Sequence, residues 1–506
     1  MRTQMPVVAF EHYMLADDQP GYDMTVAVRF WFKGLIDRAV FEPALGATLQ
    51  EHPLFQARLS GHPRRRTRQL GWVFGDALVM PYMSWESEAV PLQAPPAGTG
   101  IDLAQEIGLR LYVREGVDRT LLVAQFHHAV CDGVGLCGFF EDVLKRYALQ
   151  APGTSTPAAP KTLTIHRDAS LLTERGRFGL TRGARWRRLG KDLALAFKFF
   201  RTFPAMLSPT AGILVGRRAE PLPAGRQTFL TAEHAVLAPE TVAGLRAQLK
   251  TLPGATLNDL FLRDLFQTLG AWNAACAGCG HDVRHRAQAI ERQRRLRIAV
   301  PMCLRRPEDA AMPAANVVGM VFLTRTDPQC QEPAALLRGI TRETRILKAH
   351  HMGIAMVRVV GWLGRRGSLA KFLAAPIVPA TAVLTNLGRP YLNSELNDVT
   401  GRVAAGGLVL EHVEILPPLR RGCRVAFSVN TYGEALGVSM RYDALHMSAG
   451  EAQRLLAQFC QRLQSSARPP PGSCANSVSR RPHGEAWTSR LATPVTPPAT
   501  PAAGPL

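Results

Sequence analysis

The chain has 506 residues, of which 46% are hydrophobic and 20% are charged. This length and balance exclude a disordered or fibrous chain and predict a globular protein with more than one domain or lobe. The formal net charge of +20 favours an anionic partner such as a phosphate-bearing cofactor, an acidic carrier protein, an anionic lipid surface or nucleic acid, without choosing among them. Nine cysteines without regular spacing fit a reduced intracellular protein better than a disulfide framework.

Polar residues interrupt the N-terminal sequence before the apolar core of a signal peptide can form; they are Glu11, His12, Asp17 and Asp18. We therefore expect no cleaved leader. No stretch reaches the roughly 18 apolar residues of a spanning helix, because Lys198 and Arg201 interrupt the most apolar helical candidate, residues 193–203. These features predict a cytoplasmic protein, either soluble or lying peripherally at the inner face of the membrane.

Residues 1–160 read as a first lobe that mixes strands and helices. Runs of β-branched and aromatic residues predict strands at 25–31, 109–113 and 120–126. Apolar residues at helical spacing predict helices at 38–49, with Asp37 as N-cap, and at 135–148. Residues 52–59 are expected to form loop and strand, and the Pro- and Gly-containing residues 91–100 a surface connection.

A Pro-, Ala- and Thr-rich stretch at residues 151–160 predicts a linker, and residues 161–225 form a basic crossover. Its cations are Arg175, Arg177, Arg182, Arg185, Arg187, Arg188 and Lys191, with Phe178 and Trp186 between them. One interpretation is a solvated helix between two lobes, since charge runs usually face water. The other is a peripheral membrane helix that continues through Phe203. Nucleic-acid binding is disfavoured because no readout motif accompanies the charge.

Residues 226–464 predict a second lobe, and the Pro-, Ser-, Ala- and Thr-rich residues 465–506 a disordered tail. Strands are predicted at 229–237, 297–305, 316–323, 378–384, 408–416, 423–432 and 435–442. Helices are predicted at 241–249, 256–272, 332–350 and 448–463. The mixture in both lobes indicates an α/β protein of the α+β kind rather than a doubly wound repeat.

A histidine pair, His127 and His128, ends the apolar strand 120–126. Successive side chains of a strand face opposite ways, so only one histidine of the pair can point into a given cleft. A metal site would need further ligands at fixed spacing, and none follows Asp132 nearby, so we expect no metal. Taken alone, the pair is equally well interpreted as two satisfied core histidines.

Asp132 and Gly133 follow the pair, between the end of the predicted strand and the start of the predicted helix. Gly133 and Gly135 permit a tight turn and a close approach of the backbone. A buried aspartate there needs a cation or several N–H donors. Asp132 is therefore better suited to holding the loop, and with it the histidine, than to catalysis.

The segment His127-His128-Ala-Val-Cys-Asp132-Gly133 resembles the HHxxxDG signature of the acyl-thioester-dependent acyltransferase superfamily. This superfamily includes condensation domains, chloramphenicol acetyltransferase, polyketide-associated acyltransferases and wax ester synthase/diacylglycerol acyltransferases. Other segments similar to the wax ester synthase-like branch are residues 37–59, 256–259, 300–305, 316–320 and 385–388. The resemblance covers roughly residues 10–463.

The resemblance implies two chloramphenicol acetyltransferase-like lobes in a V-shaped pseudo-dimer with a central tunnel. It implies that His128 is the catalytic general base, that His127 supports it, and that Asp132 is structural. An arginine pairs with this aspartate in the family, and Arg305 is a better candidate here than Arg306. The tetrahedral oxyanion needs a donor, for which Thr385 and Asn386 are the candidates.

The function implied is transfer of an acyl group from acyl-CoA or a phosphopantetheinyl acyl carrier protein, used as co-substrate, to a hydroxyl acceptor. No bound cofactor is expected. One alternative is a free-standing condensation enzyme that joins carrier-bound substrates through an amide. Another is a non-catalytic protein that docks carriers or lipids, which the intact motif disfavours. The sequence leaves the acyl length, the acceptor and the oligomeric state open.

Some cysteines also invite a functional interpretation. Cys276-Ala-Gly-Cys279 is a single CxxC with His281 nearby, but zinc and redox sites usually have a second pair or a suitable fold around them. We interpret these as loop cysteines. Cys131 lies inside the motif, yet its position varies in the family, so a covalent acyl-cysteine is a minor hypothesis.

Overall fold

The structure is a computed structural model that describes residues 4–93, 100–151, 163–178, 211–214, 231–277, 295–375 and 378–468. Several expectations fall outside these ranges. They concern most of the basic crossover, from Arg182 through Phe203, the CxxC residue Cys279 with His281, and residues 469–506 of the tail.

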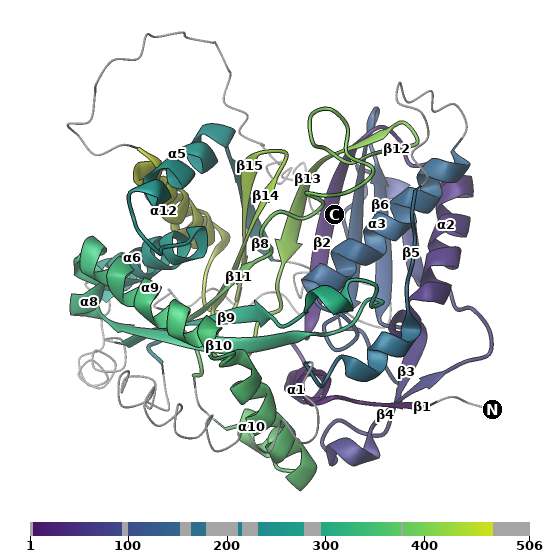
Figure 1. Cartoon of the computed structure of the whole chain (residues 1–506), viewed down its shortest axis with the longest axis horizontal. Helices are drawn as coiled ribbons and strands as arrows, with labels where there is room; N and C mark the ends of the chain where they lie inside the picture. The colour runs from purple at the N-terminus through teal and green to yellow at the C-terminus, as the bar shows by residue number, and fades with distance from the viewer. Residues whose placement is uncertain are drawn as a thin grey trace, which may run out of the picture. The chain divides into compact units, whose positions relative to one another are not determined.

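The first large sheet has the strand order β12-β13-β2-β7-β6-β5. Its strands are β2 (Thr25–Lys33), β5 (Tyr82–Ser87), β6 (Leu109–Glu115), β7 (Arg119–His127), β12 (Ala404–Ala405) and β13 (Leu408–Leu416). Helices α2 (Arg38–Glu51) and α3 (Gly133–Gln150) pack together on one face (Figure 1). As predicted, the Asp37 carboxylate caps α2 by accepting the N–H of Ala39 at 2.9 Å.

The second large sheet has the order β10-β9-β11-β14-β15-β8. Its strands are β8 (Ala232–Leu237), β9 (Arg295–Cys303), β10 (Val318–Thr326), β11 (Ala382–Asn386), β14 (Val425–Tyr432) and β15 (Ala435–Tyr442). The helices that cover it are α5 (Pro239–Lys250), α6 (Leu257–Ala277), α8 (Asp327–Gln331), α9 (Pro333–Ala349) and α12 (Ala449–Ala467). Gly433 and Glu434 both have positive φ and close the β14–β15 hairpin, a geometry that matches strand twist.

A small sheet of order β1-β4-β3 completes the N-terminal part. It consists of β1 (Gln4–Pro6), β3 (Ala57–Ser60) and β4 (Gly71–Phe74). Short 3-10 turns are η1 (Pro53–Gln56), η2 (Thr67–Gln69), η3 (Ala169–Glu174) and η5 (Pro307–Asp309). Helix α1 (Ala9–Asp17) follows β1, and α10 (Gly353–Arg366) and α11 (Leu369–Leu373) pack against it.

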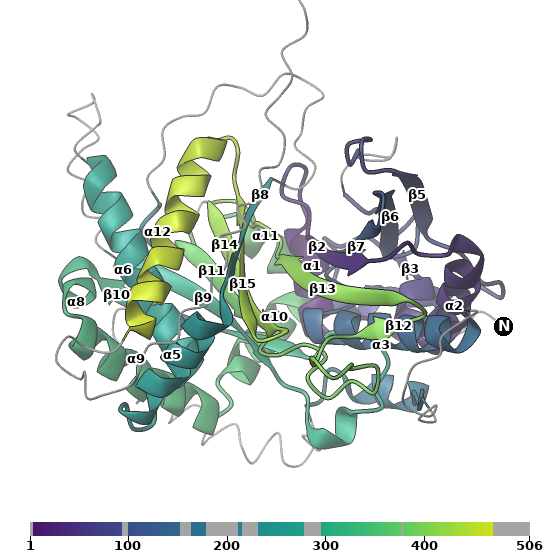
Figure 2. The same cartoon turned by 90° about the horizontal axis from the view of Figure 1, so that it is seen from above.

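The C-terminal half of the chain returns to the first sheet, which the sequence did not predict. Strand β13 pairs antiparallel with β2, and Figure 2 shows it between β2 and the strands β14 and β15. Asn430 Nδ2 on β14 donates to the carbonyl oxygen of Val413 on β13 at 3.3 Å. Helix α10 also contributes Val357 and Val360 to the N-terminal core. Residues 408–416 and 435–442 are both predicted as strands from their apolar residues. That local pattern does not indicate that the first pairs with β2 and the second with β14 and β8.

The last helix, α12, continues to Ala467, beyond Ser465, where the disordered tail was expected to begin. Ser448 caps its start by accepting the N–H of Glu451, which keeps the helix in register with the apolar stripe that faces the second core. No helix among the described residues is both long and apolar enough to cross a bilayer.

Candidate active site

The turn between β7 and α3 carries the histidine pair. His127 is the last residue of β7, and His128 lies in the turn that follows. The backbone N–H of His127 donates to Gly108 O at 3.1 Å, and that of His128 donates to Met24 O at 2.7 Å. Both anchors come from segments next to the ends of neighbouring strands, so the turn is fixed from two sides.

The side chain of His127 is turned toward the protein interior. Its Nδ1 accepts the N–H of Ala129 at 3.0 Å, which places the ring proton on Nε2, and Nε2 lies 3.5 Å from Asp18 Oδ2. Only 2% of this side chain is exposed. His127 therefore supports the turn and does not line the cavity described below.

The His128 ring has its proton on the opposite nitrogen. Nδ1 lies 3.0 Å from Cys131 O, and since a carbonyl only accepts, Nδ1–H is the donor and Nε2 keeps its lone pair. The ring meets Phe10 and Phe126 edge-on, with centroids 6.3 and 6.4 Å away. Burial lowers the pKa of His128 below 6.5, although the Asp132 carboxylate acts to raise it. The imidazole is thus neutral at neutral pH, with a basic Nε2.

Asp132 is saturated with donors. Its Oδ1 accepts the N–H of Gly135 at 2.8 Å and so caps α3, while its Oδ2 accepts the N–H of Val317 at 2.9 Å. Arg305 Nη1 donates to both oxygens, at 2.8 and 2.6 Å. A buried carboxylate with this many donors has no lone pair directed at a substrate. Its geometry is that of a structural clamp.

The clamp ties the histidine turn to a segment far away in the sequence. Arg305 Nη2 donates to Ala315 O at 2.7 Å, and Asn316 Nδ2 donates to His128 O. Burial lowers the pKa of Arg305, but the Asp132 carboxylate outweighs this and raises it above its ordinary value. Arg306 instead pairs with Asp309, at 3.0 Å, so it does not compete for Asp132.

The remaining motif residues fill space tightly. A Cβ at Gly135 would lie 2.8 Å from Cys131 Sγ and 3.1 Å from Arg305 Nη2, so only glycine fits there. At Gly133 the nearest atom would be a Leu387 methyl at 3.0 Å. Cys131 is fully buried, its thiol donates to Asp132 O at 3.0 Å, and burial raises its pKa well above 9. A protonated, enclosed thiol speaks against the acyl-cysteine hypothesis.

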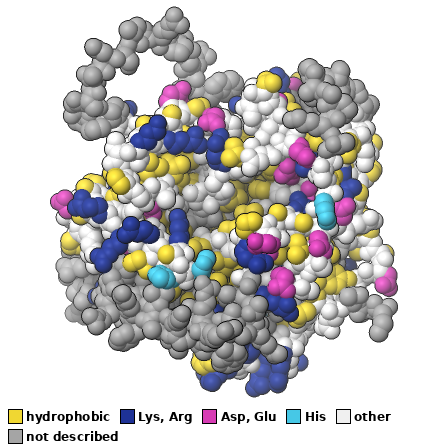
Figure 3. Space-filling model, viewed as in Figure 1, with side chains coloured by type: hydrophobic (Ala, Val, Ile, Leu, Met, Phe, Trp, Pro, Cys, Tyr) yellow, Lys and Arg dark blue, Asp and Glu magenta, His cyan; other side chains and the backbone are white. Residues whose placement is uncertain are grey.

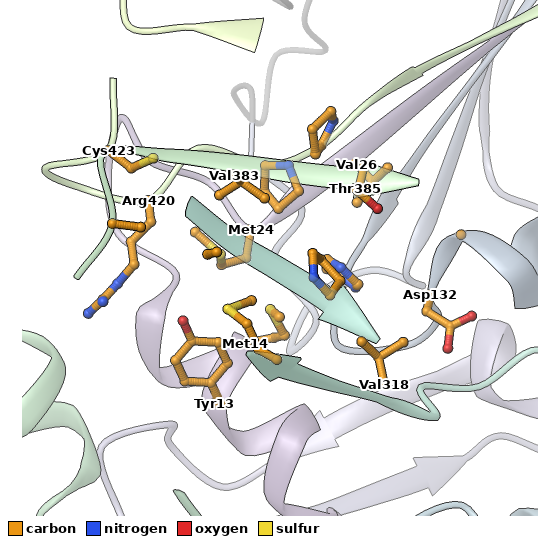
Figure 4. Close-up of a pocket in the computed structure, with 18 of the residues that line it drawn as sticks. Tyr13, Met14, Met24, Val26, Asp132, Val318, Val383, Thr385, Arg420 and Cys423 are labelled. Atoms are coloured by element: carbon orange, nitrogen blue, oxygen red, sulfur yellow. The ribbon is translucent and has the colours of Figure 1, made fainter. Parts of the chain in front are cut away.

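His128 lines a cavity of about 150 Å³ between the two large sheets. Helix α1 contributes Tyr13 and Met14, β11 contributes Val383 and Thr385, and Val318 lies at the start of β10 (Figure 4). Most of the wall is apolar, through Met14, Met24, Val26, Val318, Met320, Phe322, Val383, Leu387 and Ile415. Such a wall suits a hydrocarbon chain better than a polar ligand.

Thr385 and Asn386 lie at the end of β11 and line the same cavity as His128. Thr385 Oγ1 has no hydrogen-bond partner among the described residues, which leaves its hydroxyl available as a donor. Asn386 is more committed, because its Oδ1 accepts the N–H of Gly388 at 2.8 Å and its Nδ2 lies 3.4 Å from Asn258 Oδ1. Thr385 is therefore the better placed of the two oxyanion candidates.

Hollows flank the cavity on two sides. One, of about 370 Å³, shares Val134 and Leu387 with it. The other, of about 1190 Å³, is lined by Asp18 and Arg421, which are the sequence neighbours of the cavity residues Asp17 and Arg420. The smaller hollow therefore adjoins the His128 cavity, whereas the larger one shares no lining residue with it.

An ion pair that the sequence analysis missed closes one end of the cavity. Arg420 Nε lies 2.7 Å from Asp17 Oδ2, and Tyr13 lies beside the pair. Burial and the Asp17 carboxylate raise the pKa of Tyr13, so its hydroxyl stays protonated. No sequence signal linked Asp17 to Arg420, because the two residues come from α1 and from a loop near the C-terminus.

A possible metal site lies elsewhere. Among the described residues, His234, His412 and Glu414 place their ligand atoms within 4.8 Å of one another. Glu414 already accepts Arg29 Nη1 at 3.1 Å and Trp31 Nε1 at 2.8 Å. The guanidinium neutralises the carboxylate and opposes a second cation, and none of the three residues lines the His128 cavity.

No model of a protein family matches the sequence, and no curated protein matches it. Solved structures do. They include the first condensation domain of the calcium-dependent antibiotic synthetase (14% identity, 92% of this chain and 97% of that one, TM-score 0.61). A trichothecene 15-O-acetyltransferase from Fusarium sporotrichioides follows (12%, 92% and 96%, 0.60). A third is the polyketide synthase associated protein 5 from Mycobacterium tuberculosis (14%, 92% and 99%, 0.56). At these identities the likeness establishes the fold over nearly the whole chain.

Proposed function

Because the chain has the two-lobed fold of condensation domains and chloramphenicol acetyltransferase-like acyltransferases, we propose that it is an acyltransferase. It moves an acyl group from an acyl thioester, either acyl-CoA or an acyl carrier protein, to a hydroxyl acceptor and forms an ester. The observation that carries the proposal is the basic Nε2 of His128, which lines an apolar cavity and has no hydrogen-bond partner among the described residues.

The acceptor O–H gives its proton to His128 Nε2 as its oxygen bonds to the thioester carbonyl carbon. The resulting oxyanion is stabilised by the hydroxyl of Thr385. When the tetrahedral intermediate collapses, the C–S bond breaks and the imidazolium returns the proton to the leaving thiolate. His128 ends neutral, and Asp132 keeps the turn in place without exchanging protons.

The two acidic residues of the described cavity wall, Asp17 and Asp132, are paired with Arg420 and Arg305, so neither carboxylate is free to bind a protonated amine. The trichothecene 15-O-acetyltransferase shows that the fold accommodates transfer to a hydroxyl. Condensation domains show that carrier-bound donors are also compatible with it.

The test compares the wild type with His128→Ala, and with His350→Ala as a control at an exposed histidine. Thiol release is followed from acyl-CoAs of several lengths in the presence of alcohols and amines. We expect His128→Ala to lose about 10²–10⁴-fold in rate, as for removal of a general base. Equal thermal unfolding of the proteins rules out misfolding as the cause.

Equal thiol release by the wild type and His128→Ala would contradict the proposal. Products with amines alone would instead favour the condensation enzyme. Reaction of carrier-bound acyl groups alone would remove acyl-CoA as the donor. No turnover with any pair, together with binding of carrier or lipid, would favour a non-catalytic docking protein.

A further inference from the structure

One face of the molecule, which we call the basic face, is formed by the exposed side of α10, by α11 and by residues 61–69 between β3 and β4. The end of α10 lies directly against this loop, because Gly364 approaches Thr67 and Gly367 approaches Arg66. Figure 1 shows α10 reaching the lower edge of the molecule beside this loop. Elements distant in sequence therefore share one continuous surface.

The basic face gathers exposed cations. They are Arg64, Arg65, Arg66, Arg68, Arg365, Arg366 and Lys371. Within the described part of the chain, none of them forms an ion pair with a carboxylate, whereas other surface arginines, such as Arg119 with Glu88 at 2.9 Å, are paired. Figure 3 shows Lys and Arg side chains crowded at the lower edge, where α10 ends. Their mutual repulsion is uncompensated and favours an anionic partner.

Large apolar side chains protrude among these cations. Val359 is 57% exposed, Trp362 is 46% exposed and Phe372 is 52% exposed. Val359 and Trp362 lie one turn apart on α10 and so face the same way. The guanidinium of Arg366 lies 4.3 Å from the Trp362 ring centre, which continues the same stripe. The opposite side of α10 is buried through Val357, Val360 and Gly364.

We propose that the basic face docks on an anionic lipid surface. The cations meet the lipid phosphates, and Trp362, Phe372 and Val359 insert at the boundary between headgroups and acyl chains. A ligand recognised by charge alone would not require protruding aromatic and aliphatic side chains, whereas interfacial membrane binding uses both together. Tryptophan in particular settles at the headgroup level.

Docking has a consequence for the cavity, which rests on the proposed acyltransferase function. The hollow of about 1190 Å³ is lined by Arg64 and Lys371 of the basic face and by Asp18 and Arg421. Their neighbours Asp17 and Arg420 line the His128 cavity. A docked molecule thus turns this hollow toward the lipid.

The experiment is co-sedimentation of the full chain with vesicles of phosphatidylcholine alone or of phosphatidylcholine and phosphatidylglycerol in equal parts. We expect binding to the anionic vesicles only. Arg65→Glu/Arg365→Glu/Arg366→Glu should lower partitioning at least about tenfold, since each cation near the surface contributes. Trp362→Ser/Phe372→Ser should lower it too and should remove the binding that persists at high salt.

The matched control reverses the same number of exposed cations on α9, as Arg338→Glu/Arg342→Glu/Arg345→Glu. An equal loss in this control would show that net charge alone drives binding and would overturn the proposal. So would failure of the wild type to bind anionic vesicles, or capture of the basic face by an acidic carrier protein with no vesicle binding. Thiol release from a short, water-soluble acyl-CoA, unchanged in the basic-face variant, separates this test from that of the acyltransferase function.

Discussion

The protonation state of His128 depends on a contact within its own turn and on the aromatic rings that bury it. The Cys131 carbonyl holds the proton on Nδ1, and the packed rings of Phe10 and Phe126 exclude water from the imidazole. Burial favours the neutral ring and lowers its pKa below 6.5, although the Cys131 carbonyl and the Asp132 carboxylate both act to raise it. The turn thus fixes the position and the tautomer of the ring, and burial makes it neutral.

The pH dependence of the reaction follows from this environment. Under the proposed function the general base is the neutral imidazole, so we expect kcat/KM to rise with pH as His128 loses its proton. Because burial lowers the pKa, we expect the midpoint of this acid limb below pH 6.5. The measurement is kcat/KM against pH for a saturable acyl-CoA, with circular dichroism at each pH to exclude unfolding. A midpoint at or above 6.5 would contradict the burial of the ring.

At the residue scale, only one histidine of the pair lines the cavity, as expected, but strand parity is not the reason, because β7 ends at His127 and His128 lies in the turn. The identity of that histidine came from the resemblance. The structure places His128 at the cavity and pairs Asp132 with Arg305, as expected. It also adds Asn316 and the Asp17–Arg420 pair, for which periodicity gave no signal. Such partners come from contacts between segments far apart in sequence, which one-dimensional patterns do not encode.

Among the elements, η3 shows how a charge run can mislead. The basic crossover was interpreted as solvated or membrane-bound, yet Arg175, at its start, is buried. Arg175 Nε donates to Glu11 Oε1 at 2.6 Å, and Trp72 Nε1 donates to Glu11 Oε2 at 2.8 Å. The side chains of Arg175 and Glu11 are 2% and 0% exposed. This network ties η3 to α1 and β4.

Removal of the Arg175–Glu11 ion pair should lower the free energy of unfolding. Arg175→Met leaves the Glu11 carboxylate buried without its cation, and we expect a loss of about 3–5 kcal/mol in the free energy of unfolding. Arg177→Met removes an arginine two positions away whose pair with Glu174 is exposed, and should change stability little. Urea unfolding of both variants is the measurement. Equal midpoints would show that the Glu11 network does not stabilise the fold.

The elements predicted from sequence were those with strong local signals. The β14–β15 hairpin and the capped helices α2 and α12 form where periodicity and capping residues indicated. The short helix α1 and the helix α10 were missed. The buried residues of α10 include Ile354, Val357, Val360 and Gly361, which recur at helical spacing, so a local signal for this helix was present in the sequence.

Across the whole molecule, buried neutral histidines couple stability to pH. His12, His52, His128 and His234 all have pKa values lowered from 6.5, in each case chiefly by burial. As the pH falls below 6.5, these histidines bind protons in the unfolded chain but remain neutral in the folded chain. The unfolded state then binds more protons, so the free energy of unfolding decreases with decreasing pH.

We therefore expect the urea midpoint to fall between pH 7.5 and 5.5, about one unit on either side of the ordinary histidine pKa. His12→Gln removes one buried group, whose ring bonds Thr67 and Pro63 at 2.8 Å, and should flatten this dependence. His62→Gln, at a nearby exposed histidine, is the control and should leave it unchanged. A pH-independent midpoint in the wild type would contradict this account.

The sequence by itself determined the α/β class, most strands and helices, and the segment that contains the proposed general base. It could do so because periodicity, capping and the spacing of His128, Asp132 and Gly133 are local properties. Only the tertiary structure decided that β13 joins the first sheet, that the clamp of Asp132 reaches residues 315–317, and that loop 61–69 meets α10 in one basic face. These depend on packing between distant segments, where many pairings satisfy the same local pattern and burial selects one.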